Sequence, residues 1–408
     1  MRAYAGAPCL IMMLCSAQAQ ANEWLHVQPN ADIKTFWNAT IPYDHLLMPE
    51  APFAIGTLDV RGRATAQFGD VLQLEVHHAV TGSGVADTAI GFGPTTGVGQ
   101  LAPQLIDLGW ELEENTGMTL QGRTDRLVVR TQIGVVDLAV GRQPVTFGNG
   151  RFFSPLDLVN PFFPTTIDTE YKPGVDAARV DVYPSLTSKI TGVAALAADP
   201  ENTDDPWVFA LNGQITLGVT DLSLFAGRIL DDTVGGLSVL SSVGPVGLYS
   251  DVALTSPSAG DDFVRAVFGA DYRPTATTTL SIEGSYQGVG SDDPTGYLEL
   301  AVSDRFERGE LWTFGRAYLG LSVLQEVTPL THLSLTGLTN LEDGSALLIP
   351  ALSVSAAGNV DVAFGGFIGV GPRPEEVDLL QLATGDVGIQ SEFGLYPTAV
   401  YGATKVYL

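Results

Sequence analysis

Apolar and polar residues alternate one by one along much of this chain. From Thr57 to Phe68, apolar or small residues at even positions alternate with polar or charged residues at odd positions. The same alternation recurs over 126–133, 264–273 and 280–287. A period of two gives a β-strand one apolar face and one polar face. The pattern therefore predicts strands, and no segment shows a convincing amphipathic helical period.

About sixteen to eighteen segments have the length of roughly nine to twelve residues that a tilted strand needs to cross a bilayer. Short, nearly uncharged connections such as 184–187 and 217–220 alternate with connections that carry paired acids. Outer-membrane barrels combine short turns on one side with longer loops on the other. A soluble sandwich is the alternative, but the strands lack the second apolar face that its core needs. The sequence predicts an all-β fold, a closed antiparallel transmembrane β-barrel of about 16–18 strands with long extracellular loops and short periplasmic turns.

The first 21 residues are predicted to be a cleaved signal peptide. Arg2 precedes an apolar run that ends in A-x-A cleavage options, and the run is too short to span a bilayer. Both cysteines, Cys9 and Cys15, lie in this segment, so the mature chain has none. Leu14 before Cys15 disfavours lipidation, because that position should hold a small residue. The mature protein must be held together without disulfides.

The domain organisation follows from where the alternation begins. Residues 22–52 contain Trp24, Phe36 and Trp37 with several prolines and no clean period. They are expected to form a periplasmic N-terminal segment or small plug, with a first irregular strand as the alternative. Residues 53–408 are expected to form the barrel. The net charge of -26 excludes nucleic acid as a natural partner, because phosphates would be repelled.

The stretch 141–179 interrupts the strand pattern. Gly, Pro and aromatic residues crowd together between the end of one strand and the start of the next. Long connections without secondary structure inside a compact protein are usually functional. We therefore expect the surrounding strands to hold this stretch as the functional loop.

Motifs in this stretch carry a family resemblance. They are Gly141-Arg142-Gln143, Gly148-Asn149-Gly150, Pro155-Leu156-Asp157 and Asn160-Pro161, with a weaker echo in Ser391-Glu392-Phe393-Gly394. With them the chain resembles bacterial outer-membrane porin-like barrels. Its last strand also resembles theirs, although Leu408 stands where those barrels normally end in Phe. The resemblance implies a channel in the outer membrane of a Gram-negative cell and names no solute. It also implies outer-membrane lipid, lipopolysaccharide and the assembly machinery as partners, and leaves open a homotrimer.

In porins one long loop folds inward and narrows the channel, and the resemblance assigns that role to residues 148–175. Phe152, Phe153, Phe162 and Phe163 would pin the loop to the wall or to each other. Charges of both signs that could line the opening are Arg151, Asp157, Asp168, Glu170 and Lys172. The alternative is an outer-surface loop whose charges are merely solvated.

Strand parity selects the wall residues that face this loop. The residues expected to point inward are Arg126, Arg130, Gln132, Arg179 and Asp181. Arg142 shares parity with the apolar residues Val136, Leu138 and Val140, so either the strand bulges there or Arg142 lies above the lipid, and we assign it no role in permeation.

Paired acids in the longer connections have two interpretations. They could bind divalent cations, or they are solvated loop charges that repel one another. The residues concerned are Asp204, Asp205, Asp231, Asp232, Asp261, Asp262, Asp292 and Asp293. No dedicated metal motif and no cofactor are expected.

No catalytic signature appears in the chain. His77 and His78 are adjacent in a predicted strand, so they should face opposite sides and cannot share one ion. The sequence predicts a non-enzymatic channel for passive diffusion of small hydrophilic solutes or ions. The alternatives are a plugged transporter for a hydrophobic or specific substrate and a structural or adhesive barrel.

Overall fold

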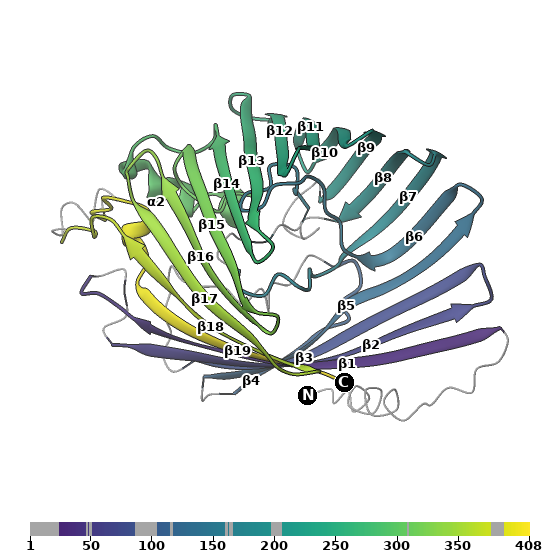
Figure 1. Cartoon of the computed structure of the whole chain (residues 1–408), viewed down its shortest axis with the longest axis horizontal. Coiled ribbons are helices and arrows are strands. Elements are labelled where there is room, and N and C mark those ends of the chain that lie inside the picture. Colours follow the sequence, from purple (N-terminus) through teal and green to yellow (C-terminus); the bar gives the residue numbers. More distant parts are fainter. Residues whose placement is uncertain are drawn as a thin grey trace.

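The protein is a closed barrel of antiparallel strands (Figure 1). The computed structural model describes residues 24–45, 48, 51–85, 104–114, 117–159, 162, 166–196, 206–307, 310–376 and 387–408. Each strand pairs with its neighbours in chain order, and the first strand pairs with the last. The ring has 18 strands, within the range of about 16–18 that the sequence predicted.

The strands of the ring are β1 (Leu25–Ile41), β2 (Phe53–Phe68), β3 (Leu72–Val85), β5 (Met118–Ile133), β6 (Val136–Gln143), β7 (Val175–Ser185), β8 (Ser188–Leu196), β9 (Trp207–Leu217), β10 (Thr220–Ile229), β11 (Asp232–Val243), β12 (Val246–Ser256), β13 (Phe263–Thr275), β14 (Thr278–Gln287), β15 (Ala317–Thr328), β16 (Thr331–Asn340), β17 (Ala346–Ala357), β18 (Val360–Val370) and β19 (Thr398–Tyr407). A further short strand, β4 (Trp110–Glu114), pairs with β5 and stands outside the ring order.

The expectation of a periplasmic segment or plug over 22–52 is wrong for residues 25–41. These residues form β1, which pairs with β2 on one edge and with β19 on the other, and so closes the barrel. The alternation was hidden because one inward position carries an apolar side chain. Phe36 is buried and stacks on Tyr401 of β19 with ring centroids 6.0 Å apart.

The two ends of the barrel differ in their connections. At one end, only two or three residues join each of eight strand pairs, which are β2–β3, β5–β6, β7–β8, β9–β10, β11–β12, β13–β14, β15–β16 and β17–β18. At the other end the connections include 144–174, 288–316 and 371–397. This asymmetry matches the short turns and longer loops expected from the sequence.

Side chains alternate between the outer surface and the interior. Val140, Leu224 and Phe268 on the outer surface are 60%, 67% and 63% exposed. An apolar outer band of this kind is what a membrane-spanning barrel presents to lipid. Two short helices, α2 (Tyr297–Ala301) and α3 (Asp304–Glu307), lie in the β14–β15 connection. No helix in the described part of the chain is long and apolar enough to cross a bilayer.

Arg142 lies on the outer side of the wall, which is one of the two alternatives that its parity left open. It forms an ion pair with Asp176 of β7 at 2.8 Å, and its guanidinium also donates to the Ile106 carbonyl at 2.9 Å. The ladder shows why segment 104–114 covers this place. Because β6 ends at Gln143, residues 118–122 of β5 have no β6 partner, and β4 pairs with them instead. Arg142 therefore holds segment 104–114 against the outer side of the wall.

Candidate functional site: a loop across the barrel lumen

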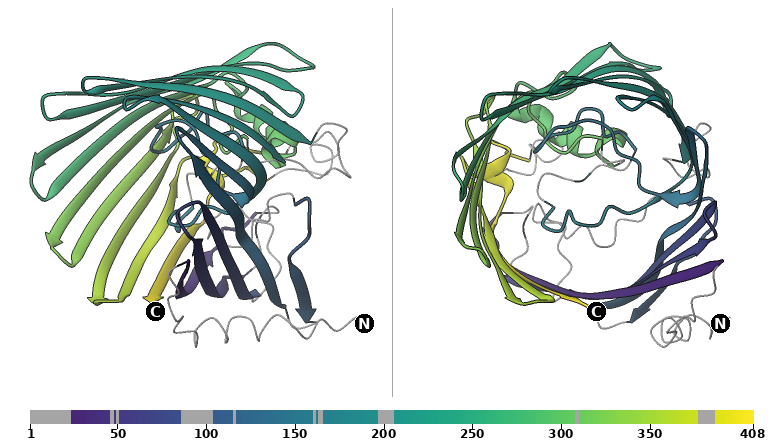
Figure 2. Two further views of the ribbon diagram at one scale, coloured as in Figure 1. Left: turned by 90° about the vertical axis from the view of Figure 1, so that its right-hand side faces the viewer. Right: turned by 45° about the vertical axis from the view of Figure 1, so that its right-hand side comes forward.

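The connection between β6 and β7, residues 144–174, folds into the barrel. The right-hand view of Figure 2 looks into the barrel and shows this loop inside the ring of strands. The chain leaves the wall just after Gly141, whose φ is +123°. A Cβ at Gly141 would lie 2.1 Å from the Leu127 carbonyl oxygen, so only glycine fits here. The inward fold agrees with the loop placement that the resemblance implied.

Two carboxylates on the far wall bind the first part of the loop through its backbone. Asp251 of β12 accepts the N–H groups of residues 149 and 150 at 2.6 and 2.9 Å. Glu283 of β14 accepts the N–H groups of residues 151, 152 and 153, with shortest distances of 2.7, 3.2 and 2.9 Å. Five consecutive N–H donors thus point at two wall carboxylates. Hydrogen bonds to ionised acceptors are the stronger kind, so this is a firm attachment.

Aromatic side chains pack the same part of the loop against the wall. Phe153 is buried and lies 5.4 Å from the Tyr318 ring of β15, centroid to centroid. Phe152 covers Gly320, where a Cβ would lie 2.5 Å from the Phe152 ring. The predicted pinning to the wall is confirmed for Phe152 and Phe153, and Phe163 lies outside the described residues.

A buried ion pair joins the end of the loop to its middle, and the same lysine also contacts the start of the loop. The Lys172 ammonium binds both carboxylate oxygens of Asp157 at 2.7 Å and donates to the Val145 carbonyl at 2.9 Å. Burial raises the pKa of Asp157 and lowers the pKa of Lys172. The expectation that these two charges line the opening is wrong, because each neutralises the other inside the loop.

Tyr171 anchors the loop to the wall of β2, β3 and β5. Its ring lies under the Arg61 guanidinium at 3.7 Å and near that of Arg126 at 4.7 Å. Its hydroxyl is hydrogen-bonded to His77 Nδ1. Arg126 also donates to the Lys172 carbonyl oxygen. Arg126 therefore points inward, as parity predicted, and it supports the loop.

Asp168 and Glu170 attach the loop to the strands that close the barrel. Lys34 of β1 lies 2.8 Å from Asp168 and 3.1 Å from Glu170. Lys405 of β19 lies 3.0 Å from Asp168 and 2.9 Å from Glu170. Burial raises the pKa of Asp168, but the two ammonium groups outweigh it and the net shift is downward. The same balance lowers the pKa of Glu170. Both acids therefore remain ionised at neutral pH.

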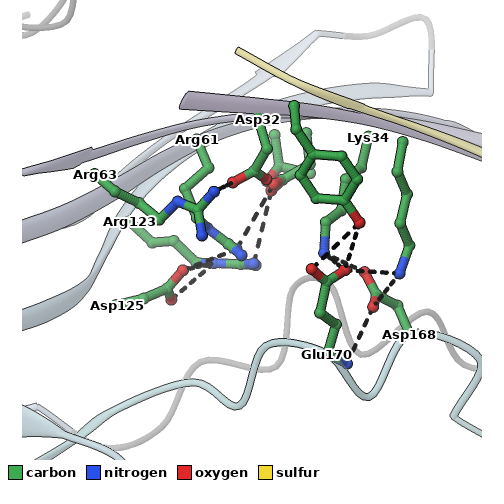
Figure 3. Close-up of polar contacts among 12 residues, drawn as sticks. Asp32, Lys34, Arg61, Arg63, Arg123, Asp125, Asp168 and Glu170 are labelled. Carbon is green, nitrogen blue, oxygen red and sulfur yellow. Dashed lines mark hydrogen bonds and ion pairs between the residues drawn. The ribbon is translucent and has the colours of Figure 1, made fainter. Parts of the chain in front are cut away.

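A row of paired charges continues along the adjacent wall (Figure 3). Arg61 lies 3.0 Å from Asp125, and Arg123 lies 3.0 Å from the same carboxylate. Arg63 lies 3.1 Å from Asp32 of β1. These arginines find their carboxylate partners on the wall itself. Most of these charges are buried and paired with one another, so the row forms no continuous basic face.

Other wall residues predicted to face inward gather near the short-turn end. Arg130, Gln132, Arg179 and Asp181 line one cavity of about 410 Å³. Arg179 binds Asp181 at 2.7 Å, and Arg130 lies 3.4 Å from Glu75. Arg151 of the loop reaches Asp271 of β13 at 2.9 Å. The Arg151 side chain stays 56% exposed, so it is the most open of the loop charges predicted for the constriction.

The acidic pairs of the longer connections mostly have partners other than a metal. Asp232 binds Arg305 at 2.7 Å, Asp292 lies 3.1 Å from Arg316, and Asp293 caps the turn at Thr295. Asp231 lies 4.0 Å from Arg228, and Asp261 and Asp262 are exposed. Asp204 and Asp205 lie outside the described residues. In the described part of the chain, no three His, Cys, Asp or Glu side chains form a potential metal site.

A buried polar cluster joins three of the longer connections. Glu392 accepts from the Tyr318 hydroxyl, from Asn340 Nδ2 at 2.8 Å and from the Phe314 N–H at 3.1 Å. The Glu392 N–H donates to Asp343 at 2.7 Å. Burial raises the pKa of Glu392 to about 7. The SEFG motif seen in the sequence therefore fastens the longer loops to each other.

Comparison with known proteins supports the fold. No protein-family model matches the sequence, and no curated protein is similar to it in sequence. The structure is similar to a BenF-like porin from Pseudomonas fluorescens Pf-5, with a TM-score of 0.58 and 9% identity over 95% of this chain and 100% of that one. It is also similar to Pseudomonas aeruginosa OccK5 (OpdH), with a TM-score of 0.56 and 9% identity over 93% of this chain and 97% of that one. Acinetobacter baumannii OccAB1 gives a TM-score of 0.54 and 9% identity over 96% and 99%. At this identity the likeness shows the shared barrel architecture and nothing finer.

Several residues that hold the loop were missed from the sequence. Asp251 and Glu283 occupy polar positions in strands whose residues alternate between apolar and polar. Nothing in the sequence indicates that these two side chains contact a loop more than 100 residues away. Lys34 was missed because its strand was not recognised. Inward parity was the available signal for Asp251, Glu283 and Lys405.

Proposed function

We propose that this protein is an outer-membrane channel through which small hydrophilic solutes or ions diffuse, narrowed by the loop 144–174. The observation that carries the proposal is that the loop is attached across the lumen, at β12–β14, at β1 and β19, and at the wall of β2, β3 and β5. A barrel of this strand number has a lumen wider than side chains can fill. A loop fixed inside it sets the width of the remaining path.

The surrounding features support the same proposal. The outer band is apolar, and the solved structures with the same fold include one described as a BenF-like porin. By analogy with outer-membrane barrels, the short turns face the periplasm and the longer loops face outward, where lipopolysaccharide lies. The plugged-transporter alternative loses its proposed plug, because residues 25–41 are a wall strand.

The test is single-channel conductance of the refolded mature protein in a planar bilayer, with a salt gradient to read ion selectivity. A matched variant replaces residues 150–172 with a short Gly-Ser linker. We expect steady conductance in the intact protein and a larger conductance in the variant. An intact protein that refolds but conducts nothing would refute the channel, and equal conductance in the two proteins would refute the constriction.

A further inference from the structure

The closing seam of the barrel carries an unusual pair of charges. The seam is the pairing between β1 and β19, which runs from Asp32 opposite Tyr407 to Ile41 opposite Thr398. In this register Lys34 stands directly opposite Lys405. Both side chains point into the lumen, since both reach the loop. Like charges directly opposite each other across an antiparallel pair are destabilising.

The loop supplies the charges that offset this repulsion. Asp168 and Glu170 each contact both ammonium groups, at distances between 2.8 and 3.1 Å. Each carboxylate therefore bridges the first strand of the chain to the last. The Tyr407 hydroxyl of β19 adds a hydrogen bond to Glu170 at 3.3 Å.

Other cations near the seam do not depend on the loop in this way. Arg63 is paired with Asp32 across the β1–β2 boundary, and Arg61 is paired with Asp125 on the wall. Lys34 and Lys405 instead take their ion-pair partners from a segment more than 130 residues from either lysine in the sequence. The Lys34 side chain is only 9% exposed, so water compensates little for the loss of these partners.

We propose that the loop 144–174 is also an internal clasp, which stabilises the closed seam by bridging Lys34 and Lys405 through Asp168 and Glu170. The lysine pair weakens the seam while the loop is outside, and the docked loop removes this repulsion. Docking of the loop and closure of the barrel are thereby coupled. This role does not depend on permeation, so it stands or falls separately from the channel.

The test measures unfolding of the protein refolded in detergent, followed in urea by the electrophoretic mobility of the folded barrel. The double variant Asp168→Asn/Glu170→Gln keeps the shape of both side chains and removes their charge. We expect it to unfold at a lower urea concentration than the wild type. Adding Lys405→Met should move the midpoint back toward the wild type, because the like-charged pair is then gone. The control is Asp292→Asn, which removes an exposed ion pair with Arg316 and should leave the midpoint unchanged.

A cross-link shows whether the effect acts at the seam. Thr35 and Thr404 are cross-strand partners in the seam, and the chain has no cysteine after Cys15. In a Thr35→Cys/Thr404→Cys background, oxidation should abolish the difference between the double variant and the wild type, and reduction should restore it.

Two results would overturn the clasp. One is a double variant whose midpoint equals that of the wild type, as expected if these are ion pairs without energetic consequence. The other is a difference that persists in the oxidised, cross-linked seam. If the double variant does not refold, the triple variant decides, because recovery of folded barrel on adding Lys405→Met supports the clasp and failure to recover refutes it.

Discussion

Glu283 offers a direct way to loosen the loop without altering the loop sequence. Its carboxylate is fully buried and accepts the N–H groups of residues 151, 152 and 153. The substitution Glu283→Gln keeps the side-chain shape but leaves one acceptor oxygen and introduces an NH2 group, which can only donate. At least one backbone N–H then faces another donor.

The size of the effect follows from the hydrogen bonds lost. A hydrogen bond to a charged group contributes about 1.5–3 kcal/mol, and a buried donor left without a partner carries a similar penalty. We therefore expect the docked loop to lose about 2–3 kcal/mol, which lowers the ratio of docked to undocked loop by roughly 30- to 150-fold. Asp251, which holds residues 149 and 150, should keep the start of the loop near the wall.

Single-channel recording in a planar bilayer measures this change. We expect Glu283→Gln to give a larger mean conductance and more frequent transitions between levels than the wild type. The control is Asp221→Asn. Asp221 accepts a hydrogen bond from the Thr216 hydroxyl on the neighbouring strand, so this substitution removes a charge without releasing a loop N–H. An unchanged conductance distribution in Glu283→Gln, or an equal change in Asp221→Asn, would show that the N–H contacts do not position the loop.

Two further outcomes are expected. Lys172→Met leaves Asp157 buried without its cation, so it should destabilise the docked loop by about 3–5 kcal/mol, and adding Asp157→Leu should recover part of this loss. The rate of protease cleavage within 144–174 measures both effects. Equal cleavage of the single and double variants would contradict the pairing. Burial raises the pKa of Glu392 above its unfolded value to about 7, so its contribution is fully present below the unfolded pKa and is lost as pH rises through about 7. The protection of residues 388–397 from hydrogen exchange should therefore fall across that pH range. In Glu392→Gln this protection should depend less on pH, and the same pH profile in both proteins would refute the role of Glu392.

The strands could be predicted from the sequence because alternation is local. The parity of each position in a strand gives the face of its side chain, and it placed Arg126, Arg179 and Asp181 inward. Even adjacent histidines separated as predicted, since His77 meets Tyr171 of the loop while His78 meets Thr124 on the outer side. β1 was not predicted as a strand, because the apolar Phe36 interrupts its polar inner face. Phe36 packs there on Tyr401 of β19, the strand that closes the ring with β1.

The site could be predicted only in part, because its contacts are neither local nor carried by matching side chains. The loop itself stood out by composition, but its attachment to Asp251 and Glu283 uses backbone N–H groups, which every non-proline residue has. No residue type in 149–153 therefore marks those contacts. The prediction for two loop charges was wrong for a related reason. Asp157 and Lys172 look like pore-lining groups until the fold of the loop brings them together.

Net charge is a poor guide to the lumen for the same reason. The chain carries a formal charge of -26, which alone suggests a path that prefers cations. Along the wall of β1, β2 and β5, however, Arg61, Arg63 and Arg123 alternate with carboxylates at distances of 3.0–3.1 Å. Their fields largely cancel beyond a few ångströms, because opposite charges at contact distance act as dipoles. Selectivity is then set by the charges that stay exposed in the lumen. These include both signs, since Arg151 is 56% exposed and Glu170 is 43% exposed. In the proposed channel, the arrangement of charges in the lumen, and not their sum over the chain, therefore decides which solutes pass.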